Sequence, residues 1–433
     1  MKLSRIVTAG AATALTLTLT AACSGGSGSA EESGTGTLTV WMMTGGPGED
    51  PIIEDVNSEF AKKYPDMDVK VEIQQWDNIA TKITTALASG KGPDIVEMGN
   101  TQTALQTYSG ALLDITDEKK SFEDSDKWLA GLAAPSTYED RLYAAPLYGG
   151  TKVVMYNKDM FAEASIKAAP ATLDELMSDC ANLQKAYEGT ANYSGFYMPG
   201  QYWFAGAPFV FGKGGELAVE KDGKWSGTLS EPKAQAGLKA WKEFQNTCST
   251  PSSRGVNTNS PDQDQLFADG RTAMLEVKAW EPAAVVEKNP KLKDKIGYFV
   301  MPGYTADKPL PTIVAGSTIG ISTATQQPEA AKAWLKIVTG KDFQGKMAQK
   351  LNLLPVSASF LPTEGVTEAL SVGSKAAEIN HAMPVSPGQA TLDGERYNEQ
   401  FFSAVVSGKD VKAQAKEYDA HVTEAYSANG ATS

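Results

Sequence analysis

The hydrophobic positions of the first hundred residues switch between two periods. Three short β-rich runs alternate with two segments whose apolar residues recur at helical spacing. In the first helical segment, residues 51–63, Ile52, Ile53, Val56 and Phe60 fall on one face. The strand-like runs are residues 37–41, 69–73 and 94–98, and the second helical segment is 79–89, which ends at Gly90. This order predicts an α/β fold with a doubly wound parallel sheet.

The same alternation resumes in the second half of the chain. Thr172 and Glu175 form a capping box, which predicts a helix that starts there. Residues 193–215, dense in Tyr, Phe, Trp, Gly and Pro, are expected to be strands and loops that present aromatic side chains. The further expected strands are 153–156, 272–277, 295–300 and 318–322, and the expected helices are 172–187, 232–246, 329–339 and much of 391–428.

The first 36 residues have the layout of an export signal. Lys2 and Arg5 precede a weakly apolar stretch, and small residues lead to Cys23. This resembles a bacterial lipobox, although Thr20 stands where an aliphatic residue is usual. The resemblance implies that residues 1–22 are a signal peptide and that Cys23 is lipidated. The alternative is cleavage near Ala22 and free secretion.

Residues 23–36 then form a Ser/Gly tether with a reach of roughly 20 Å. Two acyl chains on the lipidated cysteine hold a protein stably at a membrane. We therefore expect the folded part to work at the extracellular face of the cell membrane, anchored there through lipid only.

Composition narrows the classes of partner. The chain is 42% hydrophobic and 21% charged, and its formal net charge is −13. Loss of Lys2 and Arg5 with the signal makes the mature chain more acidic still, which argues against a nucleic-acid partner. With His381 and His421 as the two histidines and no CxxC or HxxxH spacing, we expect no metal and no cofactor.

The three cysteines suggest one disulfide. If Cys23 is acylated, Cys180 and Cys248 remain as a pair in an oxidising compartment. A bridge between them would close a loop of 68 positions. Two buried free thiols remain the alternative.

Nine segments, in order, resemble one family, the extracellular solute-binding proteins of ABC sugar importers of the maltose-binding-protein type. They cover nearly all of the mature chain. The segments are TLTVW, KKYPDMDVKVE, ALASGKGPDIVEMGN, SGALLDIT, RLYAAPLYGGTKVVMYNKDMF, TLDEL, QLFADGRTAMLEVKAW, YFVMPG and PEAAKAWLKIVTG.

The resemblance implies a periplasmic-binding-protein-like fold of type II, in which two lobes, each a doubly wound sheet, are joined by three crossovers. Carried over by motif, the crossovers fall near residues 146–151, 297–301 and 341–345. Lobe 1 is then 37–147 plus 300–343, and lobe 2 is 148–299 plus 344–433. The family further implies a monomer that traps its ligand between the lobes and presents it to the transmembrane subunits of an ABC permease.

Ligands of open α/β sheets bind beyond the carboxyl ends of the strands, so the loops there supply the candidates. Sugars are held by flat aromatic rings and by planar groups that bond hydroxyls in pairs. Trp280 is the strongest candidate, because in the resembling proteins a tryptophan after this strand stacks on a sugar ring. The full set of expected ligand-binding residues is Thr44, Gln75, Trp76, Asn100, Gln102, Tyr148, Tyr202, Trp203, Trp280, Glu281 and Tyr397.

Neutral residues follow the first and third strands, where the maltose binders of the family carry charges. We therefore expect an uncharged di- or oligosaccharide, with N-acetylated sugars included. A same-fold protein for a polyamine, an anion or a peptide is the main alternative. A glycoside hydrolase is the other, but the chain shows no motif for a carboxylate pair, a GxSxG elbow or a P-loop, and we expect no enzyme.

Overall fold

The structure is a computed structural model that describes residues 35–45, 49–76 and 79–428. The expected signal peptide, Cys23 and most of the tether lie outside the described residues. Among the helices that are described, none combines the length and hydropathy needed to cross a bilayer.

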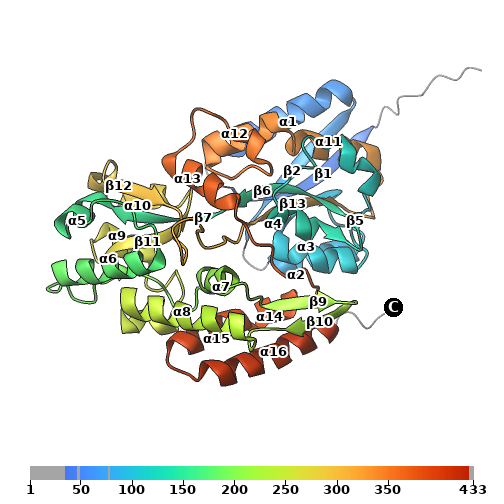
Figure 1. Cartoon of the computed structure of the whole chain (residues 1–433). Coiled ribbons are helices and arrows are strands. Elements are labelled where there is room, and N and C mark those ends of the chain that lie inside the picture. Colours follow the sequence, from blue (N-terminus) through green and yellow to red (C-terminus); the bar gives the residue numbers. More distant parts are fainter. Residues whose placement is uncertain (1–34, 46–48, 77–78, 429–433) are drawn as a thin grey trace, which may run out of the picture. The chain divides into compact units, whose positions relative to one another are not determined.

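A five-stranded sheet forms the first lobe, with the order β2-β1-β3-β13-β6 (Figure 1). β1 pairs in parallel with β2 and β3, as predicted, whereas β13 runs antiparallel to β3 and β6. The strands are β1 (Gly36–Met43), β2 (Met67–Gln74), β3 (Ile95–Gly99), β6 (Ala144–Gly150) and β13 (Ala315–Ile321).

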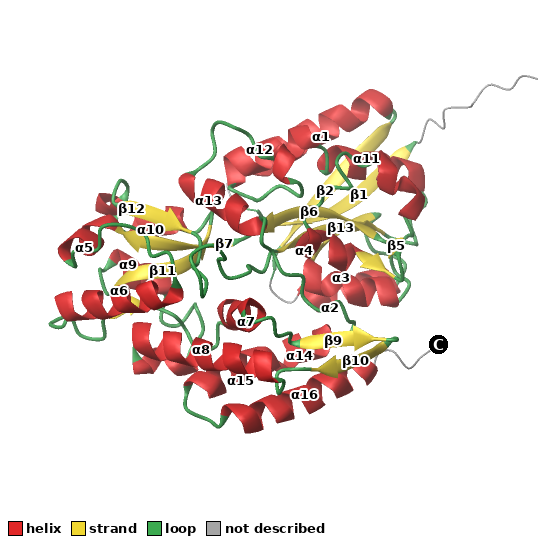
Figure 2. Cartoon of the chain, viewed as in Figure 1, coloured by secondary structure: helices red, strands yellow, loops and turns green. Residues whose placement is uncertain are grey.

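Helices cover both faces of this sheet (Figure 2). Strand side chains alternate between faces, so Leu38 and Val40 pack in the core of α1 and α11, while Met43 packs with the apolar face of α2. The helices of this lobe are α1 (Glu49–Lys63), α2 (Ile79–Ala88), α3 (Asn100–Tyr108), α4 (Ala130–Ala133), α11 (Pro328–Val338) and α12 (Lys341–Leu351).

The second lobe is built on a four-stranded sheet with the order β12-β7-β11-β8. It is mixed, because β7 runs antiparallel to both β11 and β12, while β11 and β8 are parallel. The strands are β7 (Lys152–Asn157), β8 (Ser194–Phe196), β11 (Thr272–Lys278) and β12 (Ile296–Phe299). Two small hairpins complete the strands, β4 (Thr137–Tyr138) with β5 (Arg141–Leu142) and β9 (Ala218–Lys221) with β10 (Lys224–Gly227).

The predicted N-cap, Thr172, opens the helix that follows β7 and α5, whereas Glu175 reaches back one residue further than in a capping box. The Thr172 hydroxyl accepts a hydrogen bond from the Glu175 N–H at 3.2 Å, and the Glu175 carboxylate accepts one from the Ala171 N–H. The remaining helices are α5 (Lys158–Glu163), α6 (Leu173–Ala186), α7 (Trp203–Gly212), α8 (Pro232–Cys248), α9 (Gln263–Ala268), α10 (Pro282–Lys288), α13 (Glu368–Ala377), α14 (Gln389–Glu395), α15 (Tyr397–Val406) and α16 (Val411–Ala428).

The aromatic stretch 193–215 differs from its prediction. Only β8 is a strand, and Trp203–Gly212 forms the helix α7 with Pro208 inside it. Most of this helix is buried, so it carries no polar face and no helical period in its sequence. A segment that is apolar all round cannot be told from a buried strand by periodicity.

The third crossover also differs from its prediction near 341–345. Residues 341–351 are one unbroken helix, α12, whose Phe343, Met347 and Leu351 recur every four residues and pack in the first-lobe core with α1 and α11. Residues 344–360, assigned to lobe 2 by motif, therefore pack with the first sheet. Beyond them the chain reaches α13, which contacts β7 and β12.

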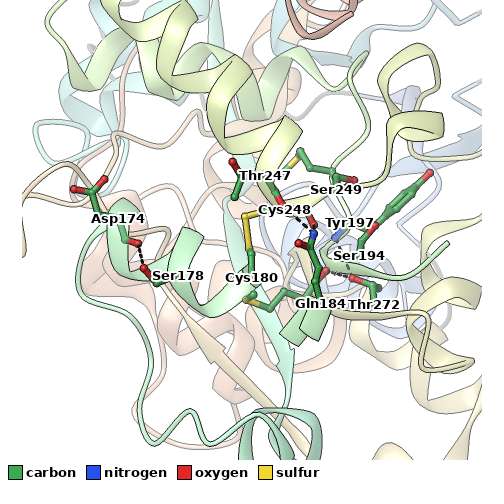
Figure 3. Close-up of a disulfide and its surroundings, with 12 residues drawn as sticks. Asp174, Ser178, Cys180, Gln184, Ser194, Tyr197, Thr247, Cys248, Ser249 and Thr272 are labelled. Carbon is green, nitrogen blue, oxygen red and sulfur yellow. Dashed lines mark hydrogen bonds between the residues drawn. A yellow bond between two sulfur atoms is a disulfide. The ribbon is translucent and has the colours of Figure 1, made fainter. Parts of the chain in front are cut away.

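A disulfide joins Cys180 in α6 to Cys248 at the end of α8, with a Cα–Cα distance of 5.1 Å (Figure 3). Both residues are fully buried. Beside them the Gln184 side-chain amide donates to the carbonyl of Thr247 at 2.9 Å. The two helices are thus tied covalently and by hydrogen bonds on one side of the second sheet.

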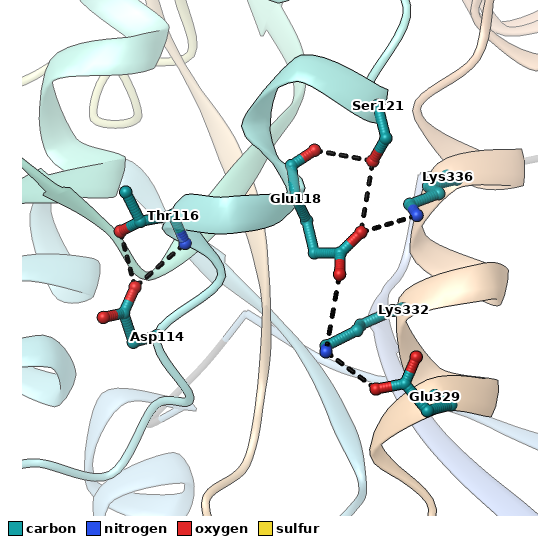
Figure 4. Close-up of polar contacts among 7 residues, drawn as sticks. All are labelled: Asp114, Thr116, Glu118, Ser121, Glu329, Lys332 and Lys336. Atoms are coloured by element: carbon teal, nitrogen blue, oxygen red, sulfur yellow. Dashed lines mark hydrogen bonds and ion pairs between the residues drawn. The ribbon is translucent and has the colours of Figure 1, made fainter.

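In the first lobe, polar contacts attach α11 to the 3₁₀ turn η1 (Thr116–Ser121) (Figure 4). Lys336 Nζ lies 2.7 Å and Lys332 Nζ 3.5 Å from the Glu118 carboxylate. The hydrogen bond from Lys336 lowers the pKa of Glu118. These pairs are partly exposed, so each adds little to stability alone, but together they fix the turn against the helix.

Candidate functional site

A cavity of about 510 Å³ opens at the carboxyl ends of the first-sheet strands β1, β2 and β3. Its remaining walls come from β6, β13, the end of α12 and the turn after β11 of the second lobe. Its lining residues are Thr44, Gly45, Trp76, Gly99, Asn100, Tyr148, Lys278, Trp280, Ala315, Gly316, Ser317, Leu351 and Leu353. We call this space the main cavity. Both lobes contribute to it, and its position is the one that an α/β sheet offers to a ligand.

Five of the predicted residues line the main cavity, namely Thr44, Trp76, Asn100, Tyr148 and Trp280. Trp76 is 42% exposed, an unusual state for so large an apolar side chain. Trp203 lines a second, smaller cavity of about 30 Å³ that shares Asn100 and Ala315 with the main one.

The other predicted residues do not line the main cavity. Gln102 accepts a hydrogen bond from the Gly99 N–H and so caps α3. Glu281 accepts from the Lys278 N–H at 2.7 Å and pairs with the Lys278 ammonium at 3.2 Å. Both side chains are therefore engaged within the protein.

Gln75, Tyr202 and Tyr397 also lie elsewhere. Gln75 is exposed beside Trp76. The Tyr202 ring packs under the Lys152 ammonium, 4.6 Å from its centre. Tyr397 packs against His421 of α16, with ring centres 4.1 Å apart.

Glu97 in β3 does not itself line the main cavity, but it binds Tyr148, which does. Its carboxylate is fully buried and accepts hydrogen bonds from the Met43 N–H at 2.8 Å and the Tyr148 hydroxyl at 2.7 Å. Burial raises the pKa of Glu97 to about 7, against the lowering effect of these hydrogen bonds. Glu97 thereby fixes the direction of Tyr148, which itself lines the cavity.

Trp280 lines the main cavity from the turn after β11, and its ring packs against the first-lobe core. A Cβ atom added to Gly150 would lie 2.6 Å from the Cη2 atom of the indole, so the ring rests directly on the glycine backbone. The Lys278 ammonium lies 5.3 Å from the ring centre. The absence of a side chain at position 150 thus allows the indole to sit where it does.

Two ionisable side chains, Lys152 in β7 and Glu276 in β11, are buried in the second lobe. Lys152 and Glu276 are 8% and 7% exposed, and Glu276 Oε2 has no hydrogen-bond partner within the described residues. Burial lowers the pKa of Lys152 and raises that of Glu276. In the described ranges, no group of three or more His, Cys, Asp or Glu side chains is arranged to hold a metal ion.

Several lining residues were not predicted. Lys278 lies two positions before Trp280, and the alternation of a strand could have indicated it. Ser317, Leu351 and Leu353 had no such signal, because they reach the cavity from strand β13 and the end of α12, far along the chain.

Comparison with known proteins agrees with this architecture. Residues 45–345 match the family model described as bacterial extracellular solute-binding protein. The diacetylchitobiose binding protein DasA of Streptomyces coelicolor is 32% identical over 384 residues, which are 88% of each chain. The maltodextrin-binding protein MdxE of Bacillus subtilis is 26% identical over 296 residues, 66% of this chain and 65% of that one.

Solved structures show the same fold. The sugar-binding protein MalE from Xanthomonas citri superposes with a TM-score of 0.79 at 18% identity, covering 90% of this chain and 98% of that chain. The GacH receptor of Streptomyces glaucescens gives 0.73 at 21% identity, covering 91% and 99%. The predicted two-lobed α/β fold is confirmed, and the chain belongs to the bacterial extracellular solute-binding proteins.

Proposed function

We propose that the protein captures an uncharged di- or oligosaccharide in the main cavity and hands it to the membrane permease of an ABC transporter. One observation carries this proposal. Two exposed or half-buried indoles, Trp76 and Trp280, share a cavity of about 510 Å³ with the polar groups of Asn100, Tyr148 and Ser317. Flat rings beside hydrogen-bonding groups suit the apolar faces and hydroxyls of sugars.

The similar proteins support the same ligand class. DasA is named for diacetylchitobiose and MdxE for maltodextrin, and the MalE protein of Listeria monocytogenes, with the same fold, was solved with maltose. A neutral ligand also fits the charges around the main cavity. Glu97 is buried and doubly hydrogen-bonded, and the charge of Lys278 is paired with Glu281.

Titration of the intact protein with ligands tests the proposal. Tryptophan fluorescence and thermal shift should respond to neutral di- and oligosaccharides, because Trp76 and Trp280 line the cavity. A response restricted to spermidine, to phosphate or to short peptides would replace the sugar with that charged class.

Binding is expected to close the two lobes around the sugar. The chain passes between the sheets at Thr151 and returns between Phe299 and Ala315, so rotation about a few residues can bring the walls together. X-ray scattering at saturating sugar should give a smaller radius of gyration than the free protein. An unchanged radius would argue for a rigid groove.

We further propose that the sugar is bound without being cleaved. Glycosidases need two free carboxyl groups that flank the scissile bond, whereas Glu97 and Glu281 are both engaged inside the protein. Chromatography of sugars after long incubation with pure protein should show no products. Turnover would assign an enzyme to this cavity.

The membrane anchor is the last part of the proposal. Acylated Cys23 would hold the folded part at the extracellular face of the membrane as a monomer, within reach of the permease. In cells, Cys23→Ala should move the protein from the membrane fraction to the medium. Retention of that variant in the membrane fraction would point to another mode of attachment.

A further inference from the structure

The smaller cavity beside the main one is a mainly apolar space that is more enclosed than the main cavity, and we call it the niche. Its volume is about 30 Å³, and its walls include Ala104 of α3, Trp203 and Phe204 of α7, Val314 and Met383. A space of this size holds about one water-sized group. Its walls offer mainly carbon atoms, so a single apolar group is the natural occupant.

The niche opens next to the main cavity, because Asn100 and Ala315 line both. A ligand in the main cavity can therefore reach the niche with a short substituent. Since α3 belongs to the first lobe and α7 to the second, such a substituent would contact both lobes at once.

Asn100 supplies a hydrogen-bond acceptor at this junction. Its Nδ2 donates to the Val314 carbonyl at 3.4 Å, and its Oδ1 has no protein partner within the described part of the chain. The other amide on the niche wall, Gln389, is occupied, since it donates to Asp393 at 2.7 Å and accepts from Tyr426 at 2.6 Å. The free acceptor thus lies where the two cavities meet.

We propose that the niche receives the methyl of an acetamido group, with its N–H donating to Asn100 Oδ1, so that the preferred ligand is an N-acetylated di- or oligosaccharide. This inference rests on the function proposed above. A methyl gains from burial against Trp203 and Phe204. A hydroxyl in the same place would leave a polar group without a partner, which is unfavourable.

The small size of the niche should also limit the length of the acyl group that the ligand carries. Its volume of about 30 Å³ accepts one methyl, and the buried Ala104, Trp203 and Val314 in its walls cannot retreat freely. Longer acyl groups should therefore be excluded. An acetyl group should bind best of a series of increasing length.

Calorimetric titration of the intact protein tests both preferences, for an acetamido group over a hydroxyl and for a short acyl group over a long one. Diacetylchitobiose should bind at least about tenfold more tightly than cellobiose, which has the same linkage and lacks the acetamido groups. N-propionyl and N-butyryl chitobiose should bind progressively more weakly than the acetyl compound. Equal affinities for acetyl and butyryl compounds would overturn the niche as the acyl site without any variant being needed.

Ala104→Leu is the matching variant, because leucine fills the niche and suits a helix. It should reduce the preference for diacetylchitobiose over cellobiose to about threefold or less. Ala61→Leu, on the exposed face of α1, is the control and should keep the full preference. A folded Ala104→Leu protein that keeps the tenfold preference would also overturn the inference.

The outcomes separate the two proposals. If diacetylchitobiose and cellobiose bind equally well, the niche has no role and the sugar-binding function stands. If neither these sugars nor longer oligosaccharides bind, the proposed function itself fails.

Discussion

The two walls of the main cavity are built in different ways. The first-lobe wall carries the Trp76 indole and two leucines as well as polar groups, and its lining residue Tyr148 is fixed by a hydrogen bond to buried Glu97, which also accepts one from the Met43 N–H. The second-lobe wall is an indole, Trp280, that rests on the backbone of Gly150 beside an ion-paired lysine. The first wall is thus held by directional bonds and the second by packing, so we expect the first to set orientation and the second to supply most of the binding free energy.

The lobes also differ in how they are stabilised, and loss of the disulfide should give the largest effect. Replacing both Cys180 and Cys248 by Ala releases a loop of 68 positions in the second lobe. We expect a loss of roughly 4 kcal/mol in the free energy of unfolding.

Denaturant titration measures that loss, and hydrogen exchange should localise it to α6 and α8 while α1 and α11 keep their protection. An equal loss of protection from hydrogen exchange in both lobes would show that the lobes unfold as one unit.

Removal of the Trp280 indole should give the second-largest effect. Trp280→Ala is expected to weaken sugar binding by about 2 to 4 kcal/mol, as for other buried aromatic anchors. Trp280→Phe keeps a flat ring and should lose less. Calorimetry that finds no change for the alanine variant would assign Trp280 to packing alone and reverse the comparison between the walls.

For the first wall, the informative measurement is the pH dependence of the free energy of unfolding, because Glu97 titrates with a raised pKa. Burial raises the pKa of Glu97 from 4.5 to about 7, so between these values the folded state keeps a proton that the unfolded state has lost. The free energy of unfolding therefore falls as pH rises from 4.5 to 7, by roughly 3 kcal/mol for this group, and levels off above.

Glu97→Gln removes that titration while keeping a hydrogen-bonding group beside Tyr148. Urea titrations of both proteins across this range isolate the effect, because Lys152 and Glu276 titrate in each. If the free energies of unfolding of the two proteins changed with pH in parallel, Glu97 would be ionised at little cost in the folded protein.

The smallest change tests how closely the second wall is packed. Gly150→Ala would place a methyl 2.6 Å from Cη2 of Trp280 and push the ring into the cavity. We expect an affinity loss of about 1 kcal/mol with little loss of stability, because the tip of a side chain can move. Gly189→Ala has open space around it and should change neither quantity.

The regular elements of the first sheet were predictable because their sequence carries one period each. Residues 37–41 alternate, and Ile52, Ile53, Val56 and Phe60 mark a single helix face, which is buried in the structure. Trp203–Gly212 was not predictable as a helix, because burial on all sides removes the period that identifies one.

The lining of the main cavity was predictable where a motif ends a strand, as for Asn100 and Trp280. It was not predictable where distant segments meet, as for Ser317 and Leu353, because no local pattern records which strand ends are neighbours. Glu97 was predictable only in part. Its place in β3 was readable, but its bond to Tyr148 depends on the neighbours of β3 in the sheet.

The junction of β6 and β7 has a practical consequence. A single residue, Thr151, separates the two strands, and its hydroxyl donates to the carbonyl of Gly373 in α13 at 2.6 Å. Tyr148, which lines the main cavity, and Gly150, which lies against the Trp280 indole, stand within three residues of that point. A biosensor that reports torsion of the backbone at Thr151 would therefore register occupancy without any dye placed near the sugar.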